Sequence, residues 1–67
     1  MGRRSITIDP RGSQFALTIH NAGVRDRTEY RDTVEGAATT CRRWGLKSPR
    51  KHVDKAVDSG GPLTVTL

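Results

Sequence analysis

Hydrophobic and polar residues alternate along the first part of the chain, which is the pattern of half-buried β-strands. The alternation occupies three stretches, Ser5–Asp9, Gln14–His20 and Val24–Arg31. The segments between them, residues 10–13 and 21–23, contain Pro, Gly, Ser and Asn, which favour turns. The pattern therefore predicts three antiparallel strands joined by tight turns.

The hydrophobic period changes to that of a helix after Arg31. Asp32 is the expected N-cap, with Glu35 three residues later as in a capping box. One apolar stripe at helical spacing follows, formed by Val34, Ala37, Ala38, Cys41 and Trp44. Gly45 is expected to end this helix, with Leu46 packing on Cys41 in a Schellman ending.

A second helix and a last strand are predicted in the remaining residues. Ser48 and Pro49 are typical of the N-cap and first position of a helix, which would bury Val53, Ala56 and Val57. Residues 60–62, Gly-Gly-Pro, break it, and Leu63–Leu67 alternates again as a strand. The order β-β-β-α-α-β predicts a single α+β domain over residues 1–67, a small antiparallel sheet with two short helices packed on one face.

The alternation also predicts which side chains face the helices. We expect Trp44 to be the largest core residue and the covered sheet face to carry Ile6, Ile8, Phe15, Leu17, Ile19, Val24, Tyr30, Leu63, Val65 and Leu67. The open face would then carry Ser5, Thr7, Thr18, His20, Arg25, Arg27 and Arg31. This open face is expected to be polar and rich in arginine.

The positive net charge of the chain limits the kinds of binding partner that we expect. Twelve Lys and Arg against seven Asp and Glu give a net charge of +5 at pH 7, and nine of the twelve are Arg. An excess of Arg fits contact with nucleic acid, with an acidic protein surface or with a nucleoprotein complex, and it also occurs as a simple solubility charge. No apolar run is long enough for a membrane span and no signal peptide is visible, so we expect an intracellular protein without a membrane partner.

Two basic surfaces are candidates for binding. The first is the open sheet face with Arg25, Arg27 and Arg31, since a small sheet can enter the major groove and Arg reads guanine there. The second is a cluster formed by Arg42, Arg43, Lys47, Arg50, Lys51 and Lys55, opposed within its span by Asp54 alone. Arg42 and Arg43 suit the C-terminus of a helix, but Arg50 and Lys51 lie in a first turn, where the helix dipole disfavours cations.

The order of three strands and a helix, with arginines on the third strand, resembles in layout the sheet-reading DNA-binding domains of some integrases and AP2-type factors. The resemblance covers about residues 3–46 and involves no diagnostic motif. It implies a sheet that reads DNA. The aromatic residues that such sheets often carry are missing from the expected open face.

Catalytic and metal chemistry find little support in the sequence. His20 and His52 lie on polar faces, Cys41 lies on the buried stripe, and the carboxylates have no metal-ligand spacing. No glycine pattern forms a phosphate loop, and no cofactor is implied. We therefore expect a non-enzymatic basic module that contacts nucleic acid or a nucleoprotein complex.

Two alternatives to nucleic-acid contact stay open. One is a small inhibitor or adaptor, of the anti-defence kind that phages and mobile elements use, docking on an acidic or nucleic-acid-binding site of a host protein. The other is a homodimer formed through the Leu63–Leu67 edge strand, because a chain this short has a small core and its single cysteine forms no internal disulfide.

Overall fold

The computed structural model describes residues 4–21 and 23–67, and it confirms the α+β fold with the order β-β-β-α-α-β. The strands are β1 (Arg4–Arg11), β2 (Gln14–Asn21), β3 (Val24–Arg31) and β4 (Leu63–Thr66). The helices are α1 (Val34–Arg43) and α2 (Pro49–Ser59). The predicted turn at residues 21–23 includes Ala22, which lies outside the described residues.

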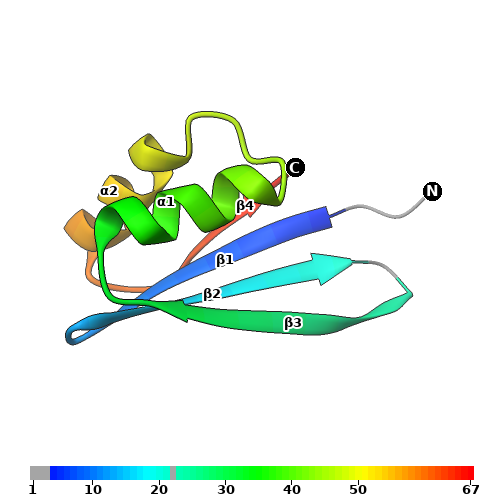
Figure 1. The fold of residues 1–67 in the computed structure, drawn as a ribbon, viewed down its shortest axis with the longest axis horizontal. Helices are drawn as coiled ribbons and strands as arrows, with labels where there is room; N and C mark the ends of the chain where they lie inside the picture. The colour runs from blue at the N-terminus through cyan, green and yellow to red at the C-terminus, as the bar shows by residue number, and fades with distance from the viewer. Residues whose placement is uncertain (1–3, 22) are drawn as a thin grey trace.

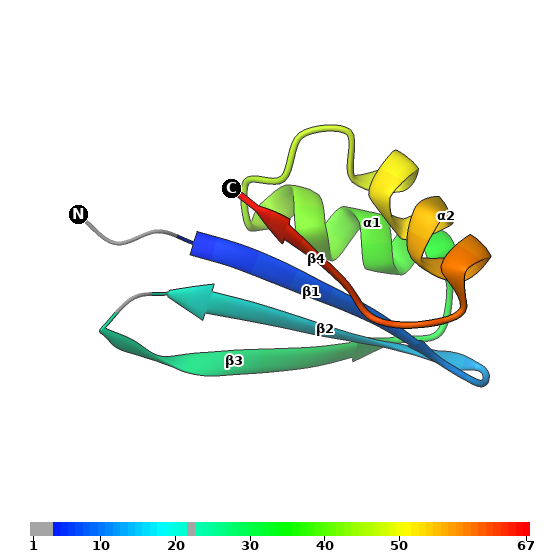
Figure 2. The same ribbon diagram turned by 180° about the vertical axis from the view of Figure 1, so that it is seen from behind.

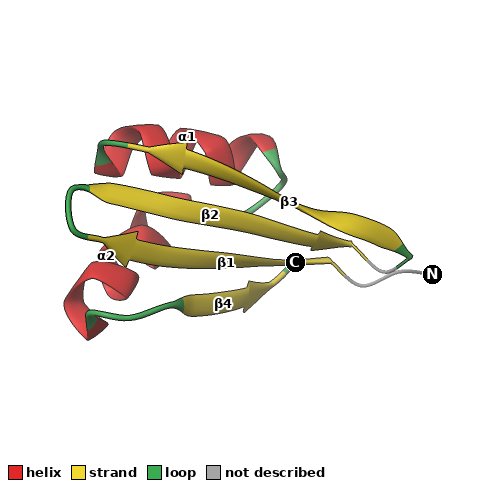
Figure 3. Cartoon of the chain, turned by 90° about the horizontal axis from the view of Figure 1, so that it is seen from below, coloured by secondary structure: helices red, strands yellow, loops and turns green. Residues whose placement is uncertain are grey.

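The strands form one antiparallel sheet in the order β3-β2-β1-β4. Both helices lie on the same face of this sheet, α1 over β2 and β3 and α2 over β1 and β4 (Figure 1). The view from behind shows β4 beside β1 at the sheet edge (Figure 2). The opposite face of the sheet carries no helix (Figure 3). The fold therefore has two layers, with the core between them.

Aliphatic residues of the two central strands form the centre of the core. Ile6, Ile8 and Leu17 are fully buried, together with Val53 and Ala56 of α2 and Ala37 and Cys41 of α1. Trp44 is only partly buried and packs at the margin of this cluster, so the expectation that it is the largest core residue is wrong. The reason is its place at the C-cap of α1, where the chain already leaves the helix.

The cap of α1 lies one residue later than expected. Thr33, rather than Asp32, is the N-cap, and its Oγ1 accepts a hydrogen bond from the backbone N–H of Gly36 (2.9 Å). The C-terminus is as expected. The backbone N–H of Leu46 donates to the carbonyl oxygen of Cys41 (3.0 Å) and that of Gly45 to Arg42 (3.0 Å), which is the Schellman arrangement.

The third strand faces the opposite way from the prediction. Phe15, Leu17 and Ile19 of β2 point into the core, and directly opposite them on β3 lie Arg31, Glu29 and Arg27. Residues directly opposite one another share a face of the sheet, so Arg27 and Arg31 lie on the helix side. Val24 and Tyr30, expected in the core, are 66% and 55% exposed. A register shift between Ile19 and Asn21 interrupts the alternation of β3.

Candidate nucleic-acid interface

The basic cluster of residues 42–55 gathers where α1 ends and α2 begins. Lys47 and Ser48 lie in the connection between the two helices, which loops away from the sheet (Figure 1). A surface depression between the helices is lined by Arg42, Lys47 and Arg50. A second one beside it is lined by Lys47, Lys51 and Lys55. The two depressions share Lys47 and Ser48, so these five cations form one surface, which we call the basic corner.

The local backbone explains how the basic corner is held. The Schellman ending of α1 turns the chain back, and Leu46 is buried in the core at 5% exposure, directly before Lys47. Ser48 adopts a left-handed backbone conformation with φ 53° and ψ 53°, and Pro49 then starts α2. His52 locks this turn, because its Nδ1 donates to the carbonyl oxygen of Ser48 (3.0 Å). Lys47 and the first turn of α2 are thereby fixed relative to each other.

Three acidic side chains, those of Glu35, Asp54 and Asp58, line the same depressions as the five cations of the basic corner. The one ion pair that the described residues form there joins Arg50 Nε to Asp54 Oδ1 at 3.8 Å, between two exposed side chains. Glu35 lines the first depression and Asp58 the second, and neither forms an ion pair with another described residue. Residues 42–55 hold six Lys and Arg and one Asp, and the rest of the chain holds six Lys and Arg and six acids. The whole net charge of +5 therefore belongs to this one stretch.

Arg43 belongs to the stretch but lines neither depression. It is exposed in the last turn of α1, where a cation complements the helix dipole. The structure thus joins five of the six predicted cluster residues into one surface and leaves Arg43 beside it.

The strand arginines are placed differently from the cluster. Arg31 Nη2 lies 2.6 Å from Glu29 Oε1, and Arg27 Nε lies 3.6 Å from Glu29 Oε2. Glu29, 19% exposed, thus compensates two arginines on the helix side of β3. Arg25 is exposed near the start of β3. The predicted arginine-rich open face is not present, because Arg27 and Arg31 lie on the helix side of β3.

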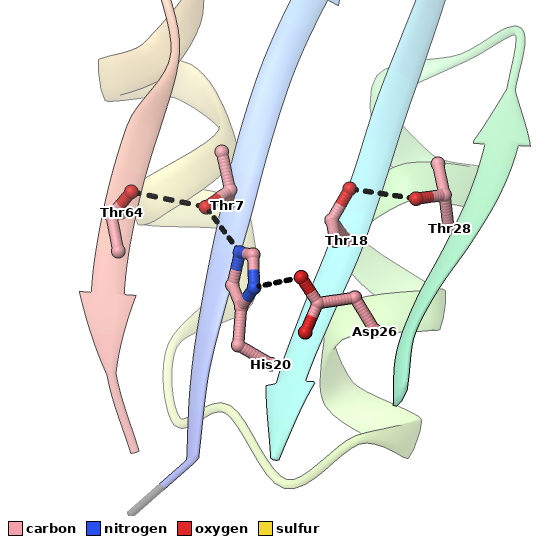
Figure 4. A network of polar contacts seen from close by, with 6 residues as sticks. All are labelled: Thr7, Thr18, His20, Asp26, Thr28 and Thr64. Carbon is pink, nitrogen blue, oxygen red and sulfur yellow. Dashed lines mark hydrogen bonds and ion pairs between the residues drawn. The ribbon is translucent and has the colours of Figure 1, made fainter. Parts of the chain in front are cut away.

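Threonines and one histidine lie along the middle of the open face of the sheet, and Asp9, Arg11 and Tyr30 line a depression on the same face. Thr64, Thr7, Thr18 and Thr28 lie opposite one another across all four strands. The hydroxyl groups of Thr7 and Thr64 are 3.0 Å apart, and those of Thr18 and Thr28 are also 3.0 Å apart (Figure 4). These hydroxyls satisfy one another.

His20 occupies the centre of this polar network. Its Nδ1 is 2.8 Å from Asp26 Oδ2, and its Nε2 is 3.1 Å from Thr7 Oγ1 (Figure 4). Sequence reasoning missed this contact because it joins three strands. A hydroxyl, an imidazole and a carboxylate in this order also occur in catalytic triads, which need free backbone N–H groups beside the hydroxyl to stabilise an oxyanion. Thr7 lies in the middle of β1, between β2 and β4, where the backbone N–H groups are used in pairing the strands. The hydrogen bonds of this network connect the side chains of β1, β2 and β3 on the open face of the sheet.

Cys41 of α1 and Arg11 at the end of β1 have shifted pKa values. Burial raises the pKa of the Cys41 thiol to about 11, so this thiol is protonated at neutral pH. A hydrogen bond and the charge of Asp9 raise the pKa of Arg11, whose Nε lies 2.7 Å from Asp9 Oδ2. Both groups therefore keep their proton at neutral pH.

Metal and membrane sites are not found in the part of the chain that the structure describes. Within residues 4–21 and 23–67, no group of three or more His, Cys, Asp and Glu side chains is placed to hold a metal ion. No helix in these ranges has the length and hydropathy needed to cross a membrane. No family model, no curated protein and no solved structure matches this chain.

Proposed function

We propose that the chain binds the phosphate backbone of nucleic acid through the basic corner. The observation that carries this proposal is the concentration of the net charge on residues 42–55, because five of the six cations of this stretch line one surface and the described residues form a single ion pair there, at 3.8 Å. Phosphates neutralised by Lys and Arg release counterions, which is the main source of affinity that does not depend on sequence. A corner that offers five cations suits this mode of binding.

The first turn of α2 supports the same proposal. Arg50 and Lys51 lie at the positive end of the helix dipole, and no side chain caps this end. Such a placement is unfavourable for the isolated domain but becomes favourable when an anion lies there, because the anion interacts with both the dipole and the cations. The left-handed Ser48 adds local strain at the same place, as is common near binding sites.

The test is a titration of short fluorescent DNA and RNA duplexes at several salt concentrations, followed by anisotropy. If about four phosphates are neutralised, log affinity falls with log salt at a slope near −3.6, which is roughly a hundredfold loss between about 50 and 200 mM salt. Lys47→Glu together with Lys51→Glu should weaken binding and reduce the slope by about two. An acid at position 51 also complements the dipole of α2, so the loss cannot be attributed to unfolding.

A matched control has the same change of net charge at another place. Arg11→Glu together with Arg25→Glu alters two exposed strand residues away from the basic corner and should change affinity little. Equal losses from both double variants would indicate diffuse charge attraction and contradict the site. No binding to DNA or RNA at low salt would refute the proposal and leave the inhibitor of a host protein, docking on an acidic surface, as the function to test.

A further inference from the structure

The two edge strands of the sheet are protected to very different degrees. In β3, five of eight residues are charged, and the pairing register is shifted between Ile19 and Asn21. Charges and bulges of this kind keep an edge from pairing with another strand. In β4 the sequence is Leu-Thr-Val-Thr, without any charge, and Leu67 follows. Among the described residues, no strand pairs with β4 on the side away from β1 (Figure 3).

The hydrogen bonds of β4 determine which peptide groups the open edge presents. The N–H of Leu67 donates to the carbonyl oxygen of Arg4 on β1 (2.8 Å). In an antiparallel pair, the residues bonded to the neighbouring strand alternate with residues whose N–H and C=O point away from it. Leu67, Val65 and Leu63 therefore bond to β1. The groups of Thr64 and Thr66 point outward.

We propose that a second copy of the chain pairs with this edge, β4 against β4 in antiparallel fashion, with the two-fold axis at Val65. Residues 63–67 read Leu-Thr-Val-Thr-Leu, which is the same in both directions. In this register Val65 lies opposite itself, Thr64 opposite Thr66 and Leu63 opposite Leu67. The outward groups of Thr64 and Thr66 then form four backbone hydrogen bonds between the copies.

The side chains match in the same register. Val65 and Leu63 lie opposite Ile6 and Ile8 on the helix side of the sheet, and the threonines lie on the open face. Pairing therefore places aliphatic side chains against aliphatic ones and threonine against threonine, which are favourable cross-strand pairs. It also covers Leu67, which is 37% exposed in the single chain.

The arrangement has a geometric consequence for the basic corner. A two-fold axis perpendicular to the sheet keeps both helix layers on the same side of one continuous sheet of eight strands, twice the four of one chain. Lys47 and His52 line a depression together with Val65 and Leu67, so each basic corner lies beside the shared edge. Both corners would face one polyanion. The dimer itself does not rest on the proposed function.

Sedimentation equilibrium tests the proposal with the protein from about 10 µM to about 1 mM, the range in which a small interface is expected to associate. The wild-type chain should reach twice its mass of 7.4 kDa. Thr64→Lys with Thr66→Lys places like charges opposite each other and should dissociate the dimer. Thr64→Glu with Thr66→Lys places opposite charges at the same positions and should preserve it, with dissociation constants differing by roughly thirtyfold.

The comparison depends on the register, since only pairing of residue 64 with residue 66 makes the second variant attractive. Thr66→Pro is an independent variant, because it removes an outward N–H while leaving the bonds to β1, and it should also weaken the dimer. Circular dichroism verifies that each variant is folded. A wild-type chain that stays monomeric at every concentration, or equal dissociation constants for the two charge variants, overturns the proposal.

Discussion

Glu29 on β3 lies directly opposite Leu17 on β2, so a carboxylate stands beside the centre of the core on the helix side of the sheet. This position lets Glu29 reach Arg31 (2.6 Å) and Arg27 (3.6 Å) at the same time. The partly buried carboxylate thus holds together two arginines of its own strand. These two ion pairs also explain how β3, an edge strand with few apolar residues, can pack beside α1 with charged side chains on its helix side.

Removing this carboxylate should destabilise the domain. Glu29→Gln leaves Arg27 and Arg31 without their shared anion, and we expect the free energy of unfolding to fall by about 1–2 kcal/mol in urea melts. Glu35→Gln is the control, because Glu35 is exposed and forms no ion pair among the described residues; it should change stability by less than about 0.5 kcal/mol. Equal effects of the two substitutions would contradict the compensating role of Glu29.

Trp44 should matter less for stability than a fully buried residue. Because it is only partly buried, Trp44→Ala should cost about 2–3 kcal/mol, below the usual range for buried tryptophan. Leu17→Ala, at a fully buried position, should prevent folding of so small a domain. Thermal melts by circular dichroism measure both, and iodide should quench part of the Trp44 fluorescence. A Trp44 inaccessible to iodide would contradict its partial exposure.

Cys41 should be inert in the folded protein. Its thiol is buried and burial raises its pKa to about 11, so thiol reagents should react with it only after unfolding. A pKa that is higher in the folded than in the unfolded state also gives stability that is lost as pH rises through the folded value. Alkaline melts should therefore destabilise the wild-type chain more than Cys41→Ala between about pH 9 and 11. Rapid labelling of the native thiol would contradict this assignment.

Gly45 should resist substitution while Gly61 should tolerate it. Gly45 has φ +101°, a conformation that a side chain disfavours, and it closes the end of α1. We expect Gly45→Ala to cost about 1–2 kcal/mol in unfolding free energy. At Gly61 a Cβ would meet nothing within 4 Å, and φ is not in the left-handed range. Gly61→Ala should therefore lie within about 0.5 kcal/mol of wild type, and a similar loss from both would refute the backbone argument.

The sequence pattern predicted those elements whose periodicity is set by burial. The alternation predicted Ile6, Ile8, Leu17 and Ile19 as buried because the helices cover one face of the sheet. Ala37 and Cys41 recur at helical spacing because α1 packs on that face of the sheet. The Schellman ending was predictable as well, since Gly45 and Leu46 carry its signature. These features follow from local chemistry together with a single buried face.

The face of β3 was not predictable in the same way. Val24 and Tyr30 lie on an edge strand that buries few apolar side chains, so no hydrophobic pattern fixes which residues point inward, and the shifted register reverses the alternation. The polar network of Thr7, His20 and Asp26 depends on pairing between three strands, which the spacing of these residues along the chain does not reveal. The basic corner was predictable because its residues are close in sequence. Their role stays a prediction until binding is measured.

The confinement of the net charge to residues 42–55 gives the molecule an electrical polarity. A cation with evenly spread charge is attracted to a polyanion in any orientation, whereas this domain experiences a torque that turns the basic corner forward before contact. Orientation ahead of collision raises the fraction of encounters that are productive, and salt should weaken it over the Debye length. In the proposed complex with nucleic acid, the placement of charge would thus act on the rate of association as well as on the strength of binding.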